Sequence, residues 1–138
     1  MAALTLRNYM THQCGLELWP PWLKTAAGYT RAKFMPDFWC GWHRSGSWTL
    51  RLIDAKCGGP DRFNVNARAH TAHLELAQFY QVPVLYVFSQ GETIDATTFA
   101  SHAQEGTPTE RGTGKPYLFV TRDVMRSFDE VFTSEGFA

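Results

Sequence analysis

The sequence is poor in cysteine, has no long apolar run and has no excess charge of either sign. Three cysteines stand at irregular spacing (Cys14, Cys40 and Cys57), which argues against a disulfide framework and favours reduced thiols. No apolar run approaches the length of a membrane span, so a membrane protein is not expected. The first residues lack the long apolar stretch of a secretory signal, and we therefore expect a cytoplasmic protein.

Length and composition fit one folded domain. The chain has 138 residues, of which 44% are hydrophobic and 14% aromatic. This length buries one hydrophobic core but not two, and the composition is typical of neither a disordered nor a collagenous chain. We predict a single domain over residues 1–138.

A net charge of zero argues against a nucleic-acid-binding protein, because such proteins usually carry a basic excess. The two halves of the chain differ, however. Residues 1–75 carry nine Lys or Arg against five acids, and residues 76–138 carry four against eight. The halves are therefore about +4 and −4, either by chance or because one surface is basic.

The hydrophobic pattern predicts an α/β fold. An aromatic run from Phe34 to His43, a turn at 45–47 and an alternating run from Trp48 to Lys56 indicate two strands of a hairpin. Further predicted elements follow in chain order: a helix capped by Asn64–Asn66 and ending near Tyr80, a buried strand at Val82–Phe88, a short helix through Thr97–Ala103 capped by Asp95, a polar loop at 105–115, a strand at Tyr117–Val120 and a closing helix at Asp123–Phe132. With a short helix from Leu4 to about Met10, we expect a central mixed sheet flanked by helices.

Two short motifs carry the chemistry. Pro36-Asp37 is followed seventeen residues later by Asp54-Ala55-Lys56, near the ends of the two predicted strands. Side chains alternate along a strand, so Asp54 and Lys56 share one face with the apolar residues Leu50 and Leu52. Unpaired charge is unfavourable there unless the face opens into a cleft or a cation neutralises it.

These motifs, with the helix and strand that follow, resemble the core of the PD-(D/E)xK nuclease superfamily. The resemblance covers residues 30–90 and implies a restriction-endonuclease-like core that hydrolyses phosphodiester bonds in DNA. It also implies a Mg²⁺ or Mn²⁺ ion held by Asp37, Asp54 and the backbone carbonyl of Ala55, a ligand set that suits such hard cations. Lys56 would orient the attacking water or neutralise the transition state. A plain ion pair between Asp54 and Lys56 at a strand end is the alternative.

Several other residues are candidates for the same site. The superfamily usually adds an acid on its first helix, and Glu17 is the only acid before Asp37. Some members add a glutamine on the helix after the lysine, where Gln78 lies. His73 shares a helix face with His70 and could touch phosphate, or be a solvated or hydrogen-bonded helix histidine. Candidate contacts to nucleic acid are basic: Arg31, Lys33, Arg44, Arg62, Arg68 and Lys115.

Two other classes of function remain open beside the nuclease. The fold could be retained without catalysis, as a module that binds nucleic acid. The chain could instead be an interaction protein, such as an inhibitor that covers its partner with tryptophan-rich strands. A zinc site at Cys40 and His43 is less favoured, because strand geometry points them to opposite faces. By analogy with small nucleases we expect nicking or junction cleavage and a homodimer.

Overall fold

The structure is a computed structural model that describes residues 17–19, 34–44, 46–106 and 115–134. Its elements, in chain order, are β1 (Glu17–Trp19), β2 (Phe38–Arg44), β3 (Ser47–Ala55), β4 (Arg62–Asn66), α3 (Ala67–Tyr80), β5 (Val84–Val87), β6 (Glu92–Asp95), α4 (Ala96–His102), β7 (Gln104–Gly106), β8 (Tyr117–Thr121), the 3₁₀ turn η3 (Arg122–Val124), β9 (Arg126–Ser127) and α5 (Phe128–Ser134). No helix among the described residues is long and apolar enough to cross a membrane.

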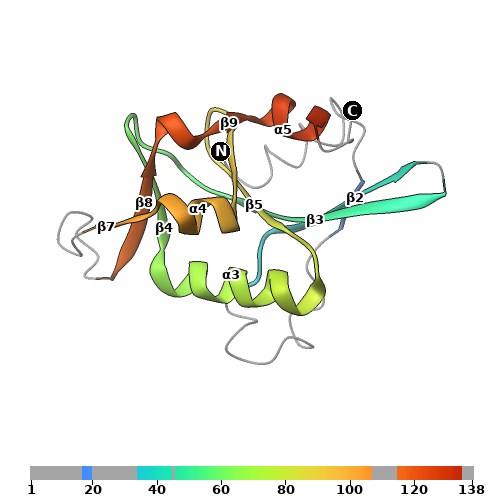
Figure 1. Ribbon diagram of the computed structural model, residues 1–138, viewed down its shortest axis with the longest axis horizontal. Helices are drawn as coiled ribbons and strands as arrows, with labels where there is room; N and C mark the ends of the chain where they lie inside the picture. The colour runs from blue at the N-terminus through green and yellow to red at the C-terminus, as the bar shows by residue number, and fades with distance from the viewer. Residues whose placement is uncertain (1–16, 20–33, 45, 107–114, 135–138) are drawn as a thin grey trace.

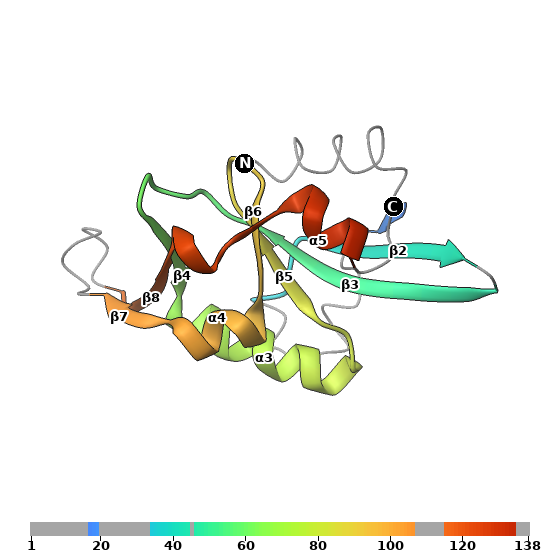
Figure 2. The same cartoon turned by 45° about the horizontal axis from the view of Figure 1, so that its top comes forward.

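The strands form two sheets. The larger sheet has six strands in the order β1-β2-β3-β5-β6-β9, and a smaller sheet has the order β4-β8-β7. Among the described strands only the β3–β5 pairing is parallel, so the larger sheet is mixed. In both cartoon views α3 and α4 lie on one side of the larger sheet and α5 on the other (Figures 1 and 2). Helices therefore flank a central mixed sheet.

Strands β2 and β3 form a hairpin that extends well beyond the rest of the sheet (Figure 2). Their register runs from Phe38 opposite Ile53 to Arg44 opposite Ser47. Two residues therefore make the turn, and the second of them, Gly46, adopts φ +80, a conformation that glycine tolerates without a steric penalty. This short turn fixes which residues of the two strands face each other.

The sequences of strand β5 and helix α3 explain why these two elements form where they do. All four residues of β5 are buried, as expected of an apolar strand between helical layers. Helix α3 starts where the Asn66 side chain accepts hydrogen bonds from the amides of Arg68 and Ala69. It ends at Gln81, which takes a left-handed conformation and donates its amide proton to the Ala77 carbonyl.

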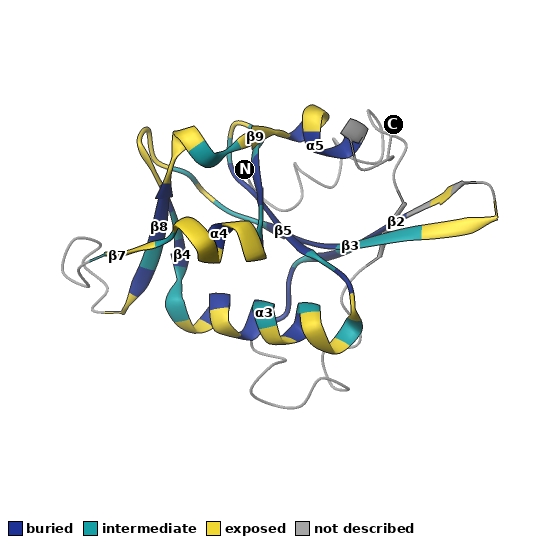
Figure 3. Ribbon diagram, viewed as in Figure 1, coloured by how far each residue is buried: buried dark blue, intermediate teal, exposed yellow. Residues whose placement is uncertain are grey.

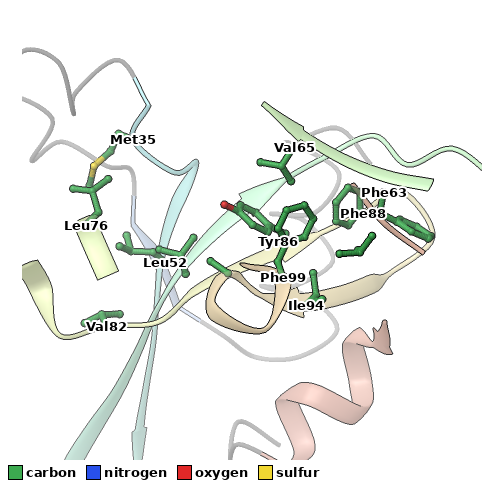
Figure 4. Packing of buried hydrophobic residues seen from close by; sticks show 13 residues of the cluster. Met35, Leu52, Phe63, Val65, Leu76, Val82, Tyr86, Phe88, Ile94 and Phe99 are labelled. Atoms are coloured by element: carbon green, nitrogen blue, oxygen red, sulfur yellow. The ribbon is translucent and has the colours of Figure 1, made fainter. Parts of the chain in front are cut away.

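The core fills the space between the larger sheet, the helices α3 and α4, and the smaller sheet. Buried residues concentrate on the facing sides of these elements (Figure 3). The cluster includes Leu52 and Tyr86 from the larger sheet, Leu76 from α3 and Phe99 from α4. Figure 4 shows Met35, just before the first motif, packed beside Leu76. The segment that leads into Asp37 is thus anchored on α3.

Most elements with a strong local signal match the prediction. The Asn66 and Asp95 caps, the hairpin, α3, α4, β5 and β8 are all present within a few residues of the predicted bounds. The predicted helix at Leu4–Met10 lies outside the described residues.

Other elements were wrongly predicted. Strands β4 and β9 were missed, since they are short and pair with strands far away in the chain. Strand β6 was also missed: it forms a hairpin with β5 but is only four residues long. The predicted loop at 105–115 begins inside β7, and its residues 107–114 lie outside the description. The predicted helix at Asp123–Phe132 is divided into η3, β9 and α5, because the Phe128 amide donates to the Gly91 carbonyl and ties this segment to β6.

Candidate active site

Asp37 and Asp54 lie across from each other at the base of the hairpin. The paired register ends with Phe38 opposite Ile53, and one further step places Asp37 opposite Asp54. Directly opposed residues of an antiparallel pair share a face of the sheet. The seventeen-residue spacing of the motifs therefore follows from a two-residue turn midway between them.

The backbone of Ala55 takes part in this arrangement. Its amide donates a hydrogen bond to Asp37 Oδ2 at 2.9 Å. The flanking amides of the strand point the other way, since the Lys56 amide donates to the Val87 carbonyl of β5. The amide and the carbonyl of one strand residue point to the same side, so the Ala55 carbonyl also faces the Asp37 edge.

Lys56 returns to the same face beyond the end of β3. Its Nζ lies 2.7 Å from Asp54 Oδ2, as the period of two along the strand predicts. The lysine side chain is 24% exposed and the aspartate side chain 9% exposed, so the pair spans from the core to the surface. The ion pair that we considered as the plain alternative exists, and it lies directly beside Asp37.

The two carboxyl groups repel each other. Burial and the neighbouring Asp54 charge raise the pKa of Asp37 above its ordinary value, and the hydrogen bond from the Ala55 amide only partly opposes this. Such a pair stores electrostatic repulsion that a cation relieves.

The residues present fit a hard divalent cation. Asp54 Oδ2 is buried and makes no hydrogen bond of good geometry, although Lys56 lies beside it. The described residues contain no group of three or more His, Cys, Asp or Glu side chains able to hold a metal. Mg²⁺ needs no such cage, because it is usually held by one or two carboxylates, waters and substrate phosphate. Asp37, Asp54 and the Ala55 carbonyl match that requirement.

His73 lies behind this site, inside the core. It is 2% exposed, its Nε2 is 2.7 Å from the Phe34 carbonyl and its Nδ1 is 2.9 Å from the Tyr86 hydroxyl. Burial, followed by the Lys56 charge, lowers its pKa to about 4, so the ring is neutral at neutral pH. This confirms the hydrogen-bonded histidine among our expectations, and the buried ring is not presented to a phosphate in solution.

The other candidates lie elsewhere. Glu17 belongs to strand β1 and not to a helix. It lies opposite Gly41, four residues after Asp37 in the chain, and its side chain is outside the description. Gln78 is exposed on α3 and lines a surface hollow with Gln81 and Asp95. None of the residues lining that hollow is Asp37, Asp54 or Lys56.

The candidate nucleic-acid contacts are scattered. Arg31 and Lys33 fall outside the described residues, as does the side chain of Arg44. Arg62, Arg68 and Lys115 are exposed, on β4, on α3 and just before β8. The Arg62 guanidinium lies 4.1 Å from the centre of the Phe119 ring, a cation–π contact that holds it along the smaller sheet. The three described candidates, Arg62, Arg68 and Lys115, therefore lie on separate elements and do not form one patch with Asp37.

Sequence reasoning missed Tyr86, and it considered His70 with His73 as a candidate phosphate contact or acid, or as a solvated or hydrogen-bonded helix histidine. Tyr86 lies opposite Asp54 in the β3–β5 register, and its hydroxyl is 2.9 Å from Nδ1 of both His70 and His73. A signal existed: a buried tyrosine in an apolar strand needs a hydrogen-bond partner, and two histidines three residues apart on one face of the preceding helix offered one.

Comparison with known proteins supports the fold. No family model and no curated protein matches the sequence. Several solved structures are similar, among them the following two. The first is Hjc, a Holliday junction resolvase from Archaeoglobus fulgidus, with a TM-score of 0.57, 11% identity and coverage of 98% of this chain and 99% of that one. The second is a nuclease from a fusselovirus, with a TM-score of 0.48, 12% identity and coverage of 97% and 85%.

The likeness to the resolvase establishes the architecture. The chain has a restriction-endonuclease-like fold, with a mixed central sheet flanked by helices. This confirms the fold class that the resemblance implied. What the chain does must be argued from its own site.

Proposed function

We propose that this chain is a metal-dependent endonuclease that hydrolyses phosphodiester bonds in DNA. One observation carries the proposal: Asp37, just before β2, meets Asp54 and Lys56, at the end of the neighbouring strand β3, in a restriction-endonuclease-like sheet. The raised pKa of Asp37 supports the proposal, because burial and the neighbouring Asp54 disfavour its charged form even with Lys56 close by. Residues with perturbed electrostatics of this kind concentrate at functional sites.

Each residue has a distinct role in this proposal. Asp37 and Asp54 would hold Mg²⁺ or Mn²⁺ with the Ala55 carbonyl, and the bound ion would acidify water and stabilise charge on the phosphate. Lys56 reaches the surface beside Asp54, where its ammonium orients the attacking water and stabilises negative charge on the phosphate in the transition state. The Ala55 amide fixes the Asp37 carboxylate before substrate arrives.

The hairpin offers a surface for the DNA. Residues 38–53 contain Arg44, Arg51 and His43 but no acid. Trp48, which is 49% exposed, packs its ring against His43 with the ring centres 5.1 Å apart. Strand geometry puts Ser47 roughly 24 Å from Asp54, which is the length of about seven base pairs of duplex. The hairpin would therefore contact the substrate well away from the cleaved bond.

A cleavage assay on several substrates tests the proposal. Purified protein is incubated with end-labelled linear, nicked, single-stranded and four-way-junction DNA, and with matched RNA, in Mg²⁺, Mn²⁺ or EDTA. We expect metal-dependent cleavage that Asp54→Ala and Lys56→Ala abolish. Asp61→Ala is the matched control, because Asp61 is an exposed acid in the link after β3. Cleavage that survives in both site variants, or no metal-dependent cleavage of any substrate, overturns the proposal.

The substrate preferred within this proposal is branched DNA, with the chain acting as a homodimer that cuts or nicks paired strands. The fold shared with a junction resolvase supports this choice by analogy. A gel-shift experiment with the same substrates separates the binding module from the enzyme, since a module without catalysis would bind the junction and leave it intact. An inhibitor would do neither.

A further inference from the structure

A chain of hydrogen bonds runs through the core directly behind the candidate site. It links His70 to the Tyr86 hydroxyl at 2.9 Å, that hydroxyl to His73 at 2.9 Å, and His73 to the Phe34 carbonyl at 2.7 Å. All three side chains are buried, at 3%, 0% and 2% exposure respectively. Figure 4 shows the Tyr86 hydroxyl emerging from the middle of the core cluster.

The chemistry of the groups fixes the direction of this chain. A carbonyl only accepts, so His73 must carry its proton on Nε2, and its Nδ1, in a neutral ring, is then an acceptor. Tyr86 has one proton to donate and must give it to His73. The remaining contact is satisfied only if His70 donates from Nδ1 to the Tyr86 oxygen. Burial lowers the pKa of both rings to about 4, in keeping with neutral histidines.

This direction has a consequence for His70. With its proton on Nδ1, its Nε2 carries a bare lone pair. That atom is buried without a hydrogen-bond partner among the described residues. The ring is thus held in the tautomer that free histidine disfavours, and Tyr86 is the group that holds it there.

The acceptor at the end of the chain matters for Asp37. Phe34 starts the four-residue segment that ends in Asp37, and the segment makes two further anchoring contacts: Met35 is buried in the core cluster and Asp37 Oδ2 accepts from the Ala55 amide. His73 therefore holds one end of this segment to α3 while Ala55 holds the other end to β3. The charges of Asp37 and Lys56 both act on the His73 ring, so the ring and the site are neighbours.

We propose that His70, Tyr86 and His73 form a directed positioning chain that sets the place of the Asp37 carboxylate through the Phe34 carbonyl. His73 is a positioning residue in this account, with Tyr86 and His70 fixing its tautomer and orientation. The part of the proposal that concerns catalysis rests on the proposed nuclease function. The part that concerns tautomers and the position of Asp37 does not.

The wild-type protein provides the first test. Nitrogen-15 NMR distinguishes the two neutral tautomers of each ring, and we expect Nε2–H for His73 and Nδ1–H for His70 near pH 7. In Tyr86→Phe, His70 loses its acceptor and is expected to return to the Nε2–H form. An Nε2–H form of His70 in the wild type, or an unchanged Nδ1–H form in Tyr86→Phe, overturns the chain.

The amide proton of Ala55 reports the position of Asp37 without any activity. His73→Leu removes the donor to Phe34, and we expect the Ala55 amide resonance to shift upfield and its solvent exchange to quicken. His73→Gln keeps a donor at a similar reach and is expected to retain the wild-type resonance. Phe99→Leu is the packing control, because Phe99 lies 4.9 Å from the His70 ring centre and 5.5 Å from that of Tyr86 and makes none of these hydrogen bonds.

An Ala55 amide that is unchanged in His73→Leu, or shifted equally in Phe99→Leu, contradicts the positioning role. If His73→Leu does not fold, the histidine tautomers of the wild type and of Tyr86→Phe still test whether the hydrogen-bond chain has the proposed direction. The positioning role is then tested by the Ala55 amide resonance, which should shift in Tyr86→Phe but not in Phe99→Leu.

Cleavage kinetics then connect the chain to the reaction. For His73→Leu we expect kcat to fall roughly tenfold to a hundredfold with KM for DNA little changed, as for other groups that support a catalytic ligand. His73→Gln should recover most of the rate. Wild-type protein that cleaves no DNA refutes the proposed function and leaves the NMR result standing, whereas His73→Leu that cleaves at the wild-type rate refutes the positioning role alone.

Discussion

Asp37 combines two requirements that conflict in a single side chain. Its carboxylate is held by the Ala55 amide, which favours the charged form, yet it lies half-buried beside Asp54, which disfavours that form. The balance raises its pKa, so the ionised group destabilises the fold in the absence of a cation. Strain of this kind is common where a site is built for a ligand instead of for stability.

The first prediction follows from that balance. Asp37→Asn keeps an oxygen to accept from Ala55 and removes the repulsion, so in EDTA at pH 8 its denaturation midpoint should be at or above that of the wild type. A raised pKa makes the wild type less stable as pH rises through that pKa, and the difference should therefore shrink in acid. Urea denaturation of both proteins, at pH 8 and in acid, measures this difference in midpoint.

Adding Mg²⁺ should reverse the stability ranking of the wild type and Asp37→Asn. Mg²⁺ binds only the folded protein in this proposal, so it should raise the melting temperature of the wild type, and the rise should grow with the logarithm of the Mg²⁺ concentration above Kd. Asp37→Asn should show no such rise and should cleave roughly a hundredfold more slowly or worse. A melting temperature that rises equally in both proteins would mean that the ion binds elsewhere.

The buried histidines make a second prediction. His70 and His73 have pKa values lowered to about 4, from 6.5 in the unfolded chain. Between these values the unfolded state takes up protons that the folded state does not, so stability falls as pH falls from about 6.5 to 4 and is unaffected above that window. Each ring contributes a slope of about 1.4 kcal/mol per pH unit. Urea denaturation at pH 7 and pH 5 measures the loss, and a double His70→Gln, His73→Gln variant that keeps the full slope would contradict the assignment.

Among the elements, the β2–β3 hairpin determines which residues meet at the candidate site. Its two-residue turn places Asp37 opposite Asp54, and its free end carries Trp48 away from the sheet. The strand period and the turn residues were readable from the sequence, so this hairpin and the shared face of Asp54 and Lys56 were predicted correctly. Strands β4 and β9 were not, since pairing with distant strands, and not local propensity, determines them.

A third prediction tests the hairpin as the DNA-contacting element. Trp48→Ala should weaken DNA binding roughly tenfold, the effect of losing one stacked base contact, with little change in the cleavage rate of bound DNA. Phe79→Ala is the control, since Phe79 is 62% exposed on α3 and is the other large exposed hydrophobic residue of the described chain. Fluorescence anisotropy with labelled duplex measures both, and an equal loss in the two variants would exclude a specific role for the hairpin.

At the scale of the whole molecule, the sequence predicts some residues of the candidate site and the structure is needed to find the others. The residues of the two motifs could be identified from the chain alone, because their spacing and alternation put them at one strand end. The groups behind them could not, since His70, Tyr86 and His73 meet only when α3 packs on β5. Likewise Glu17 and Gln78 were named by analogy, and the structure places Glu17 in a strand and Gln78 at a separate hollow. Residues close together in the chain can thus be assigned to one site from the sequence, but the meeting of distant residues is seen only in the folded structure.

The fourth prediction concerns the molecule acting on its substrate and tests the central claim most directly. The measurement is the single-turnover rate of four-way-junction cleavage as Mg²⁺ is titrated, for the wild type, Asp37→Asn, Asp54→Ala, Lys56→Ala and the Asp61→Ala control. We expect a saturable, Mg²⁺-dependent rate for the wild type and Asp61→Ala, and a loss of roughly a hundredfold or more for each of the three site variants. Equal rates in the wild type and the site variants, or a rate that does not depend on Mg²⁺, would contradict the account.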